Sequence, residues 1–143
     1  MLNISEIDFD EFDKDYRSAK MYHYRGEQFL AEGQNYSVVF NVASVALENY
    51  LIALCDLYGV EPGNHNYTCL MDAVETIMEV PEHLNREIRS LDSIFAICSL
   101  ENYYHGMPEV NDVGRVLSMC EEVHALFDPV RVGAVSAAFA DRE

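Results

Sequence analysis

The stretch VVFNVASVALENYLIAL, residues 38–54, is the most apolar part of this sequence. Asn41, Ser44, Glu48 and Asn49 interrupt it, so it falls short of the roughly 20 predominantly apolar residues that a membrane-spanning helix needs. Wound as an α-helix, it is apolar around nearly the whole circumference and leaves one polar stripe, formed by Asn41, Ser44 and Glu48. Such a helix belongs at the centre of a bundle, and we expect no membrane segment.

Helical patterns continue on both sides of this central helix. Apolar residues recur at intervals of three and four, and glycine and proline separate the segments. Apolar alternation flanked by hairpin turns, which would indicate strands, is missing from the sequence. The predicted helices cover about residues 10–31, 36–58, 67–78, 81–104 and 113–127.

The chain of 143 residues has the length of one domain, and half of its residues are hydrophobic, which suffices for a core of its own. We therefore predict an all-α fold, an antiparallel helical bundle of about five helices that forms a single domain over residues 1–143. Its core covers about residues 10–128. The tail, residues 129–143, is rich in alanine and valine and either docks as a short helix or frays.

Acidic residues outnumber basic ones by 25 to 9, which gives a formal net charge of −16. A surface of this charge repels phosphate backbones, so we expect no binding to generic RNA or DNA. The N-terminus carries no basic segment followed by an apolar stretch, and the four cysteines form no Cys-x-x-Cys pair. These features favour a cytoplasmic protein with reduced thiols.

Metal and phosphate motifs are sparse. Helical bundles that hold metals combine facing glutamates with paired Glu-x-x-His motifs, and this chain has one clear motif of that kind, from Glu121 to His124. No second one accompanies it, so we expect no metal and no cofactor. Neither standard glycine-rich phosphate loop occurs. Arg17 and Lys20 belong to the best phosphate-binding candidates, although pairing with neighbouring acidic side chains explains them better.

Two further places combine polar groups in a way that suits chemistry. Tyr103, Tyr104 and His105 stand at the end of a predicted helix and offer two phenols and an imidazole for base binding or proton transfer. The alternative is a core edge whose hydroxyls reach water. Glu48, inside the most apolar helix, needs a partner or a raised pKa, or else it lines a wet groove with the other two residues of its polar stripe.

A longer pattern joins the central helix to the segments after it. It comprises Ala43-x-x-Ala46-Leu47-Glu48-x-x-Leu51-Ile52-Ala53-Leu54, Gly59, the turn Asn64-His65-Asn66 and the helix end Tyr103-Tyr104-His105. A chain with these residues resembles the HEPN superfamily, small helical domains that are often paired with nucleotidyltransferases. The resemblance covers about residues 15–127.

The resemblance implies a bundle that dimerises through long helices, with a cleft at the dimer interface. In the ribonuclease members, the cleft holds an arginine that is followed four to six residues later by a histidine. His105 occupies the histidine position here, whereas Cys98, Ser99 and Leu100 stand where the arginine belongs. Because a guanidinium at that place would stabilise developing charge, its absence favours a non-catalytic member.

The fourth predicted helix also favours a homodimer. It carries an apolar seam beside further apolar positions, and one bundle rarely buries both stripes. The seam is Leu84, Ile88, Leu91, Phe95 and Cys98, and the further positions are Ile94 and Ile97.

Three functions remain open at this point. The leading one is a non-catalytic, HEPN-like homodimer that binds a nucleotide or a protein partner such as a nucleotidyltransferase, in a context like that of toxin–antitoxin pairs. The alternatives are a divergent ribonuclease that uses His105 and an acidic protein that neutralises a basic partner. The candidate catalytic residues are His105, Tyr104, Tyr103, Asn102 and Glu48, and the candidate ligand-binding residues are Glu48, Ser44, His65, Arg17 and Lys20.

Overall fold

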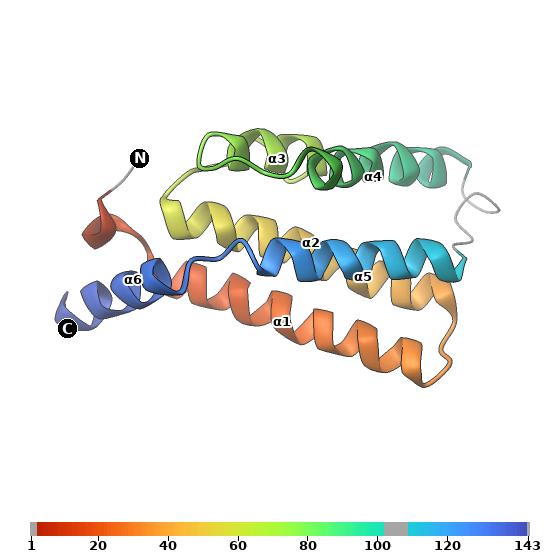
Figure 1. The fold of residues 1–143 in the computed structure, drawn as a ribbon, viewed down its shortest axis with the longest axis horizontal. Helices are drawn as coiled ribbons and strands as arrows, with labels where there is room; N and C mark the ends of the chain where they lie inside the picture. Colours follow the sequence, from red (N-terminus) through yellow and green to blue (C-terminus); the bar gives the residue numbers. More distant parts are fainter. Residues whose placement is uncertain (1–2, 102–108, 143) are drawn as a thin grey trace.

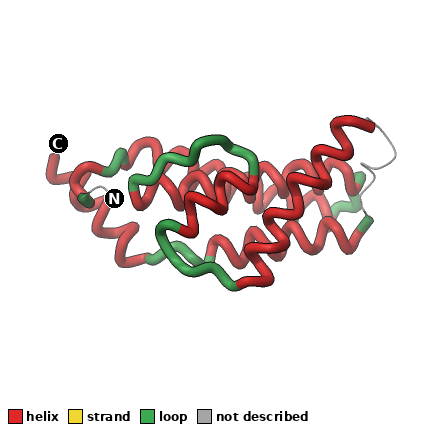
Figure 2. Tube along the Cα trace, turned by 90° about the horizontal axis from the view of Figure 1, so that it is seen from above, coloured by secondary structure: helices red, strands yellow, loops and turns green. Residues whose placement is uncertain are grey.

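The computed structural model describes the backbone of residues 3–101 and 109–142 and the side chains of residues 3–93 and 109–141. Every element of regular structure in these ranges is helical, which confirms the predicted all-α fold (Figures 1 and 2). The elements are the 3-10 helix η1 (Ile4–Glu6) and the α-helices α1 (Phe9–Ala31), α2 (Tyr36–Tyr58), α3 (Tyr67–Glu75), α4 (Glu82–Glu101), α5 (Val110–His124) and α6 (Pro129–Arg142).

The described part holds one α-helix more than the sequence predicts, because the tail forms α6. Pro129 starts this helix, where its missing N–H costs nothing, and Asp128 accepts a hydrogen bond from the backbone N–H of Val130 at 2.9 Å. α5 begins three residues earlier than predicted. There the Glu109 N–H donates to the carboxylate of Asp112 at 2.9 Å, which caps the first turn.

The central helix has the ends that its sequence predicts. At the start of α2, the side chain of Asn35 accepts a hydrogen bond from the Ser37 N–H at 2.8 Å. At its end, Gly59 takes a left-handed conformation with φ of 69°, and the N–H of Val60 reaches back to the carbonyl of Cys55 at 3.0 Å. This ending favours glycine because a side chain there would meet the backbone.

The helices form two groups. α1 and α2 form an antiparallel hairpin, and α5 packs along α2, so these three helices make the body of the bundle (Figure 1). α3 and α4 pack together on the other side of α2, and α4 runs obliquely to the long axis of the body (Figure 2). η1 and α6 meet at one end of the molecule, where the rings of Phe9 and Phe139 lie 5.2 Å apart.

α2 supplies the largest share of the core. Ala43, Leu47, Leu51 and Leu54 are fully buried, as expected for a helix that contacts neighbours on most sides. By length and composition α2 also matches a membrane span, but 61% of its most apolar stretch is buried inside the bundle. The same composition is typical of a core helix. α1 approaches α2 closely at Gly26, where an added Cβ would lie 3.8 Å from the backbone of Ala43.

A polar network fastens α3 to α4. Arg89 forms ion pairs with Asp72, at 2.8 Å, and with Glu75. The carboxylate of Asp92 accepts hydrogen bonds from the first two backbone N–H groups of α3, those of Tyr67 at 2.9 Å and Thr68 at 2.7 Å. A carboxylate at a helix N-terminus satisfies otherwise unpaired donors and favours the helix dipole. The network therefore fixes the start of α3, and with it Tyr67, relative to α4.

The apolar seam predicted for the fourth helix is partly observed. Leu84, Ile88 and Leu91 are buried within the single chain. The side chains of the other seam positions and of the second stripe lie outside the described residues. These three seam residues therefore belong to the hydrophobic core of the single chain.

Candidate functional site

A groove of about 380 Å³ opens on the side of α2 that faces α3. Asn41, Ser44, Val45 and Glu48 line it from α2, and Tyr67 lines it from the first turn of α3. The three polar residues from α2 are the polar stripe that interrupts its apolar surface. The sequence predicted the stripe and a wet groove, while the valine and tyrosine walls appear only in the fold.

Tyr67 joins the two walls of the groove. Its hydroxyl donates a hydrogen bond to the backbone carbonyl of Ser44 at 2.8 Å, and its backbone is held by Asp92 of α4. Burial raises the pKa of the Tyr67 phenol, and the nearby Glu48 raises it further. The phenol therefore stays protonated and serves as a fixed wall.

Glu48 and Ser44 are the reactive features of the groove. Burial raises the pKa of the Glu48 carboxyl, and the electrostatic interaction with His65, in the turn before α3, lowers this pKa in part. The buried hydroxyl oxygen of Ser44 has no hydrogen-bond partner among the described residues. A buried polar atom without a partner is costly, so a ligand that satisfies it gains binding energy.

The lining of the groove determines which ligand chemistry it suits. No lysine or arginine lines it among the residues that the structure describes, so it offers no cation to a phosphate. Carboxylate and hydroxyl oxygens accept hydrogen bonds, and Val45 and the Tyr67 ring offer apolar contact. The arrangement therefore suits a group with N–H donors at the end of an apolar stem.

The other candidate ligand-binding residues lie elsewhere. His65 is exposed in the turn before α3 and acts on Glu48 through its charge. Arg17 and Lys20 lie on α1. Arg17 pairs with Asp13, four residues earlier, at 2.8 Å, and the Lys20 ammonium sits 4.3 Å from the centre of the Tyr16 ring. Arg17 therefore pairs with an acidic neighbour, as the surface-pairing interpretation expects, whereas Lys20 contacts an aromatic ring of its own helix.

The helix-end candidates cannot be placed. Asn102, Tyr103, Tyr104 and His105 lie outside the described residues. Of the catalytic candidates, Glu48 alone has a described position. In the described part, no second carboxylate, imidazole or thiol lines the groove beside Glu48; the other lining groups are an amide, a hydroxyl, a valine and a phenol.

The sequence missed a second polar assembly, which runs between α1, α2 and α5. His23 of α1 is buried and its Nδ1 lies 2.9 Å from the Tyr50 hydroxyl of α2. The rings of Tyr50 and His124 stack at 5.1 Å, and His124 Nε2 lies 3.0 Å from the Tyr16 hydroxyl. Burial lowers the pKa of His124, and the neighbouring His23 and Lys20 add to this effect. The available signal was His23 itself, which shares an apolar helix face with Ala19 and Gly26.

Comparison with known proteins adds no relative, since no family model, curated sequence or solved structure matches this chain.

Proposed function

We propose that this protein is a non-catalytic helical binding module that recognises a basic protein partner, with one lysine or arginine of the partner in the groove beside Glu48. The observation that carries the proposal is the lining of the groove. The half-buried Glu48 carboxyl lies there beside the buried, unpaired Ser44 hydroxyl, and no lysine or arginine lines the groove among the described residues. A basic side chain supplies hydrogen-bond donors and a positive charge to the Glu48 carboxylate.

The shape of a basic side chain fits the groove as well as its charge does. Lysine and arginine carry apolar stems that pack on surfaces such as Val45 and the Tyr67 ring, while the charged head reaches a carboxylate. A cation beside Glu48 also favours its ionised form, which burial disfavours. Binding and ionisation of Glu48 are therefore mutually stabilising.

The net charge of −16 supports the same kind of partner. An acidic surface attracts basic proteins over a distance and accelerates their association, while it repels the phosphates of nucleotides and nucleic acids. A nucleotide in the groove would place its phosphates against this field. We therefore favour a protein over a nucleotide, and nucleotide binding becomes an outcome of the test.

The HEPN resemblance supplies the biological context of the proposal. We propose a cytoplasmic homodimer whose partner is a protein such as a nucleotidyltransferase, as in toxin–antitoxin pairs of that superfamily. The all-helical fold and the residue pattern of α2 support this context. Apolar side chains exposed on α1 and α2, among them Met21, Tyr24 and Val38, are available for a subunit contact. Light scattering at micromolar concentration would give twice the chain mass.

The test of the proposed function compares the wild-type chain with Glu48→Gln as baits in the native cell extract. A protein that the wild-type bait captures and the Glu48→Gln bait captures less is purified, and its affinity for both chains is measured at several salt concentrations. We expect a basic partner, an affinity that falls with added salt, and a loss of about tenfold or more in Glu48→Gln, because the variant removes the charge that faces the partner.

Glu32→Gln is the matched control, since it removes the same charge from an exposed site at the end of α1. It should bind the partner as the wild type does. Equal loss in both variants would mean that overall charge, and no defined groove, governs binding. A nucleotide that co-purifies with the chain and shifts the NMR signals of Ser44 and Glu48 would contradict the proposal of a protein ligand.

A further inference from the structure

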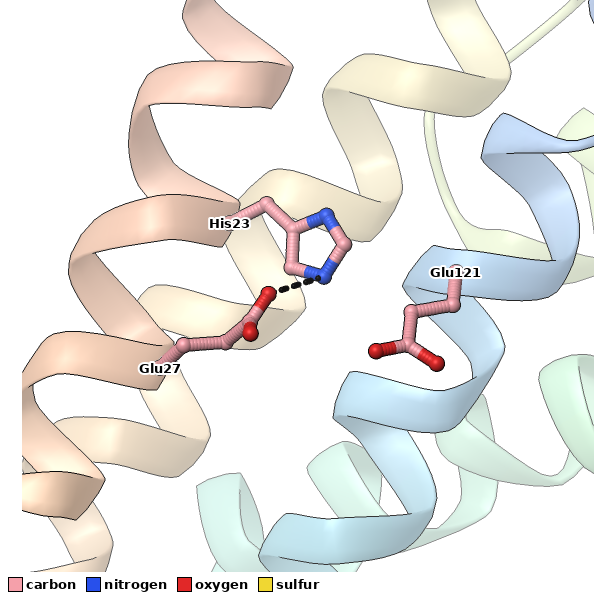
Figure 3. A group of neighbouring side chains, drawn as sticks. All are labelled: His23, Glu27 and Glu121. Carbon is pink, nitrogen blue, oxygen red and sulfur yellow. Dashed lines mark ion pairs between the residues drawn. The ribbon is translucent and has the colours of Figure 1, made fainter.

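His23, Glu27 and Glu121 form a cluster at the surface between α1 and α5, separate from the groove (Figure 3). One ligand atom from each residue, an imidazole nitrogen or a carboxylate oxygen, lies within 4.8 Å of the other two. His23 and Glu27 are four residues apart and therefore share a face of α1. Glu121 reaches the same place from α5, which is distant in sequence.

His23 is the unusual member, because it is buried and one of its nitrogens lacks a hydrogen bond. Only 9% of its side chain is exposed. Nε2 lies 2.9 Å from a carboxylate oxygen of Glu27, yet it makes no hydrogen bond, since that contact is outside hydrogen-bond geometry. In Figure 3, Nε2 faces the space between the two carboxylates. A buried nitrogen aimed at two carboxylates is the donor set of a cation site.

The opposite side of the His23 ring is fixed by Tyr50. Its hydroxyl lies 2.9 Å from Nδ1, in the buried core. Histidines that bind metals usually donate their second ring N–H to an oxygen, which sets the tautomer and orients the ring. With the proton on Nδ1, the lone pair of Nε2 is directed into the cluster. There the lone pair faces the carboxylate oxygens of Glu27 and Glu121, and a cation between the three ligand atoms relieves the repulsion among their electron pairs.

We infer that His23, Glu27 and Glu121 bind a divalent transition-metal cation of the Mn²⁺, Fe²⁺ or Zn²⁺ class. One imidazole and two carboxylates are the ligand types that these ions accept, whereas Mg²⁺ and Ca²⁺ prefer oxygen ligands alone. Three protein ligands leave coordination positions open. Because both carboxylates are solvent-exposed, water fills those positions.

The geometry needs only a small adjustment to hold an ion. A tetrahedral ion with bonds of about 2.1 Å separates its ligand atoms by roughly 3.4 Å, somewhat less than the present limit of 4.8 Å. Side-chain rotation of the two exposed glutamates closes this gap, while the buried imidazole stays in place. The helix axes are held close by Gly26, where an added Cβ would lie 3.4 Å from the Leu117 side chain of α5.

The sequence alone led to the opposite expectation. It offered one Glu-x-x-His motif, from Glu121 to His124, without a second one to face it. In the fold the two members of this motif separate, because His124 contacts the Tyr16 hydroxyl at 3.0 Å while Glu121 approaches His23. The facing partner is the pair His23 and Glu27, four residues apart on α1, which the Glu-x-x-His pattern does not describe.

The test uses Mn²⁺ as the probe, because the free cysteines of this chain bind Zn²⁺ but have little affinity for Mn²⁺. Mn²⁺ is added to the full chain in millimolar Mg²⁺, which occupies diffuse sites on the acidic surface. Paramagnetic broadening of NMR signals locates the ion, and electron paramagnetic resonance counts it. We expect one Mn²⁺ per chain, with broadening centred on His23, Glu27 and Glu121.

The variants separate a defined site from general acidity. Glu121→Gln and Glu27→Gln change exposed side chains, so the fold persists, and each should weaken Mn²⁺ binding at least tenfold. Tyr50→Phe removes the oxygen that orients His23 and should weaken binding about tenfold, as loss of outer-shell partners does. Glu122→Gln is the control: Glu122 is next to Glu121 but pairs with His83 at 2.9 Å on another face, and this variant should bind as the wild type does.

Two results would overturn the inference. Broadening spread evenly over the acidic residues would show that Mn²⁺ meets no defined site. Equal affinity in the wild type, Glu27→Gln and Glu121→Gln would show that these carboxylates are not ligands of the bound Mn²⁺.

Discussion

Glu48 and Tyr50 are two residues apart on α2, yet they lie in opposite environments. Two residues correspond to about 200° around a helix, so the side chains leave from nearly opposite faces. Tyr50 is 1% exposed and its hydroxyl is paired with His23, whereas Glu48 is half-buried at an open groove whose Ser44 hydroxyl has no partner among the described residues. On the core face polar groups are paired and stabilise the fold. On the groove face they are left available for a ligand.

The largest expected effect comes from breaking the core face. Leu47→Ala removes a fully buried side chain and should lower the free energy of unfolding by about 3 kcal/mol, since it leaves a cavity among helices that cannot close on it. Val45→Ala, two residues away and 40% exposed, should change it by less than about 0.5 kcal/mol. Urea unfolding of both variants measures the contrast. Similar losses in the two variants would contradict the assignment of the faces.

Tyr50→Phe tests the pairing on the core face with a smaller change. The ring and its stacking on His124 remain, but Nδ1 of the buried His23 loses its partner. We expect a loss of about 2 kcal/mol in urea unfolding, because a buried polar group left unpaired loses its hydrogen bond with no water in exchange. Tyr24→Phe, at an exposed site on α1, should be neutral. An unaffected Tyr50→Phe would mean that water replaces the hydroxyl.

Asp56, at the C-terminal end of α2, adds a pH dependence. Burial raises the pKa of Asp56 from 3.8 to about 8, together with a hydrogen bond to the Asp15 carboxyl and the repulsion between the two carboxylates. Below pH 4 Asp56 is protonated in both states. Between about pH 4 and 8 the unfolded chain loses the Asp56 proton while the folded chain keeps it, so this group's contribution to stability falls as pH rises.

Asp56→Asn removes this dependence. Below pH 4 the variant and the wild type should have the same free energy of unfolding. Above pH 8 the variant should be more stable by on the order of 1 kcal/mol. This gain is modest because solvent screens the partly exposed pair of Asp56 and Asp15. Thermal unfolding across pH 4–9 measures it. Asp141→Asn, on the exposed side of α6, is the control, because it removes the same charge at a site away from Asp56. A gain of the same size at pH 4 would point to a cause other than ionisation.

The smallest effect belongs to the groove face. Burial raises the pKa of the Glu48 carboxyl. At neutral pH the ionised carboxylate therefore lowers the stability of the folded chain, whereas at low pH the protonated carboxyl has no such effect. Glu48→Gln should therefore raise the unfolding free energy by a few tenths of a kcal/mol at pH 7 and leave it unchanged at pH 4. Paired with the expected loss of partner binding, this gain would identify Glu48 as a residue kept for binding at the expense of stability. A destabilised Glu48→Gln would place Glu48 among the structural contacts.

Much of this arrangement follows from the sequence alone. The spacing of apolar residues predicts the helices, because a helix repeats every 3.6 residues and must turn its apolar face inward. The same rule predicts that the helix over residues 36–58 is central, and that Asn41, Ser44 and Glu48 form one stripe. Asn35 and Gly59 mark the ends of that helix for local reasons, since capping and a left-handed turn involve only neighbouring residues.

Only the tertiary structure decided which faces meet. Periodicity tells which side of a helix is buried, but two helices can pack in several registers, and each register brings different side chains together. The sequence could not show that Tyr67 closes the groove over Ser44, that Tyr50 pairs with His23, or that Glu121 of α5 joins His23 and Glu27 of α1. Those contacts join residues 23 to 98 positions apart, so no local pattern encodes them, and they exist because the packing of the whole bundle fixes where each helix face lies.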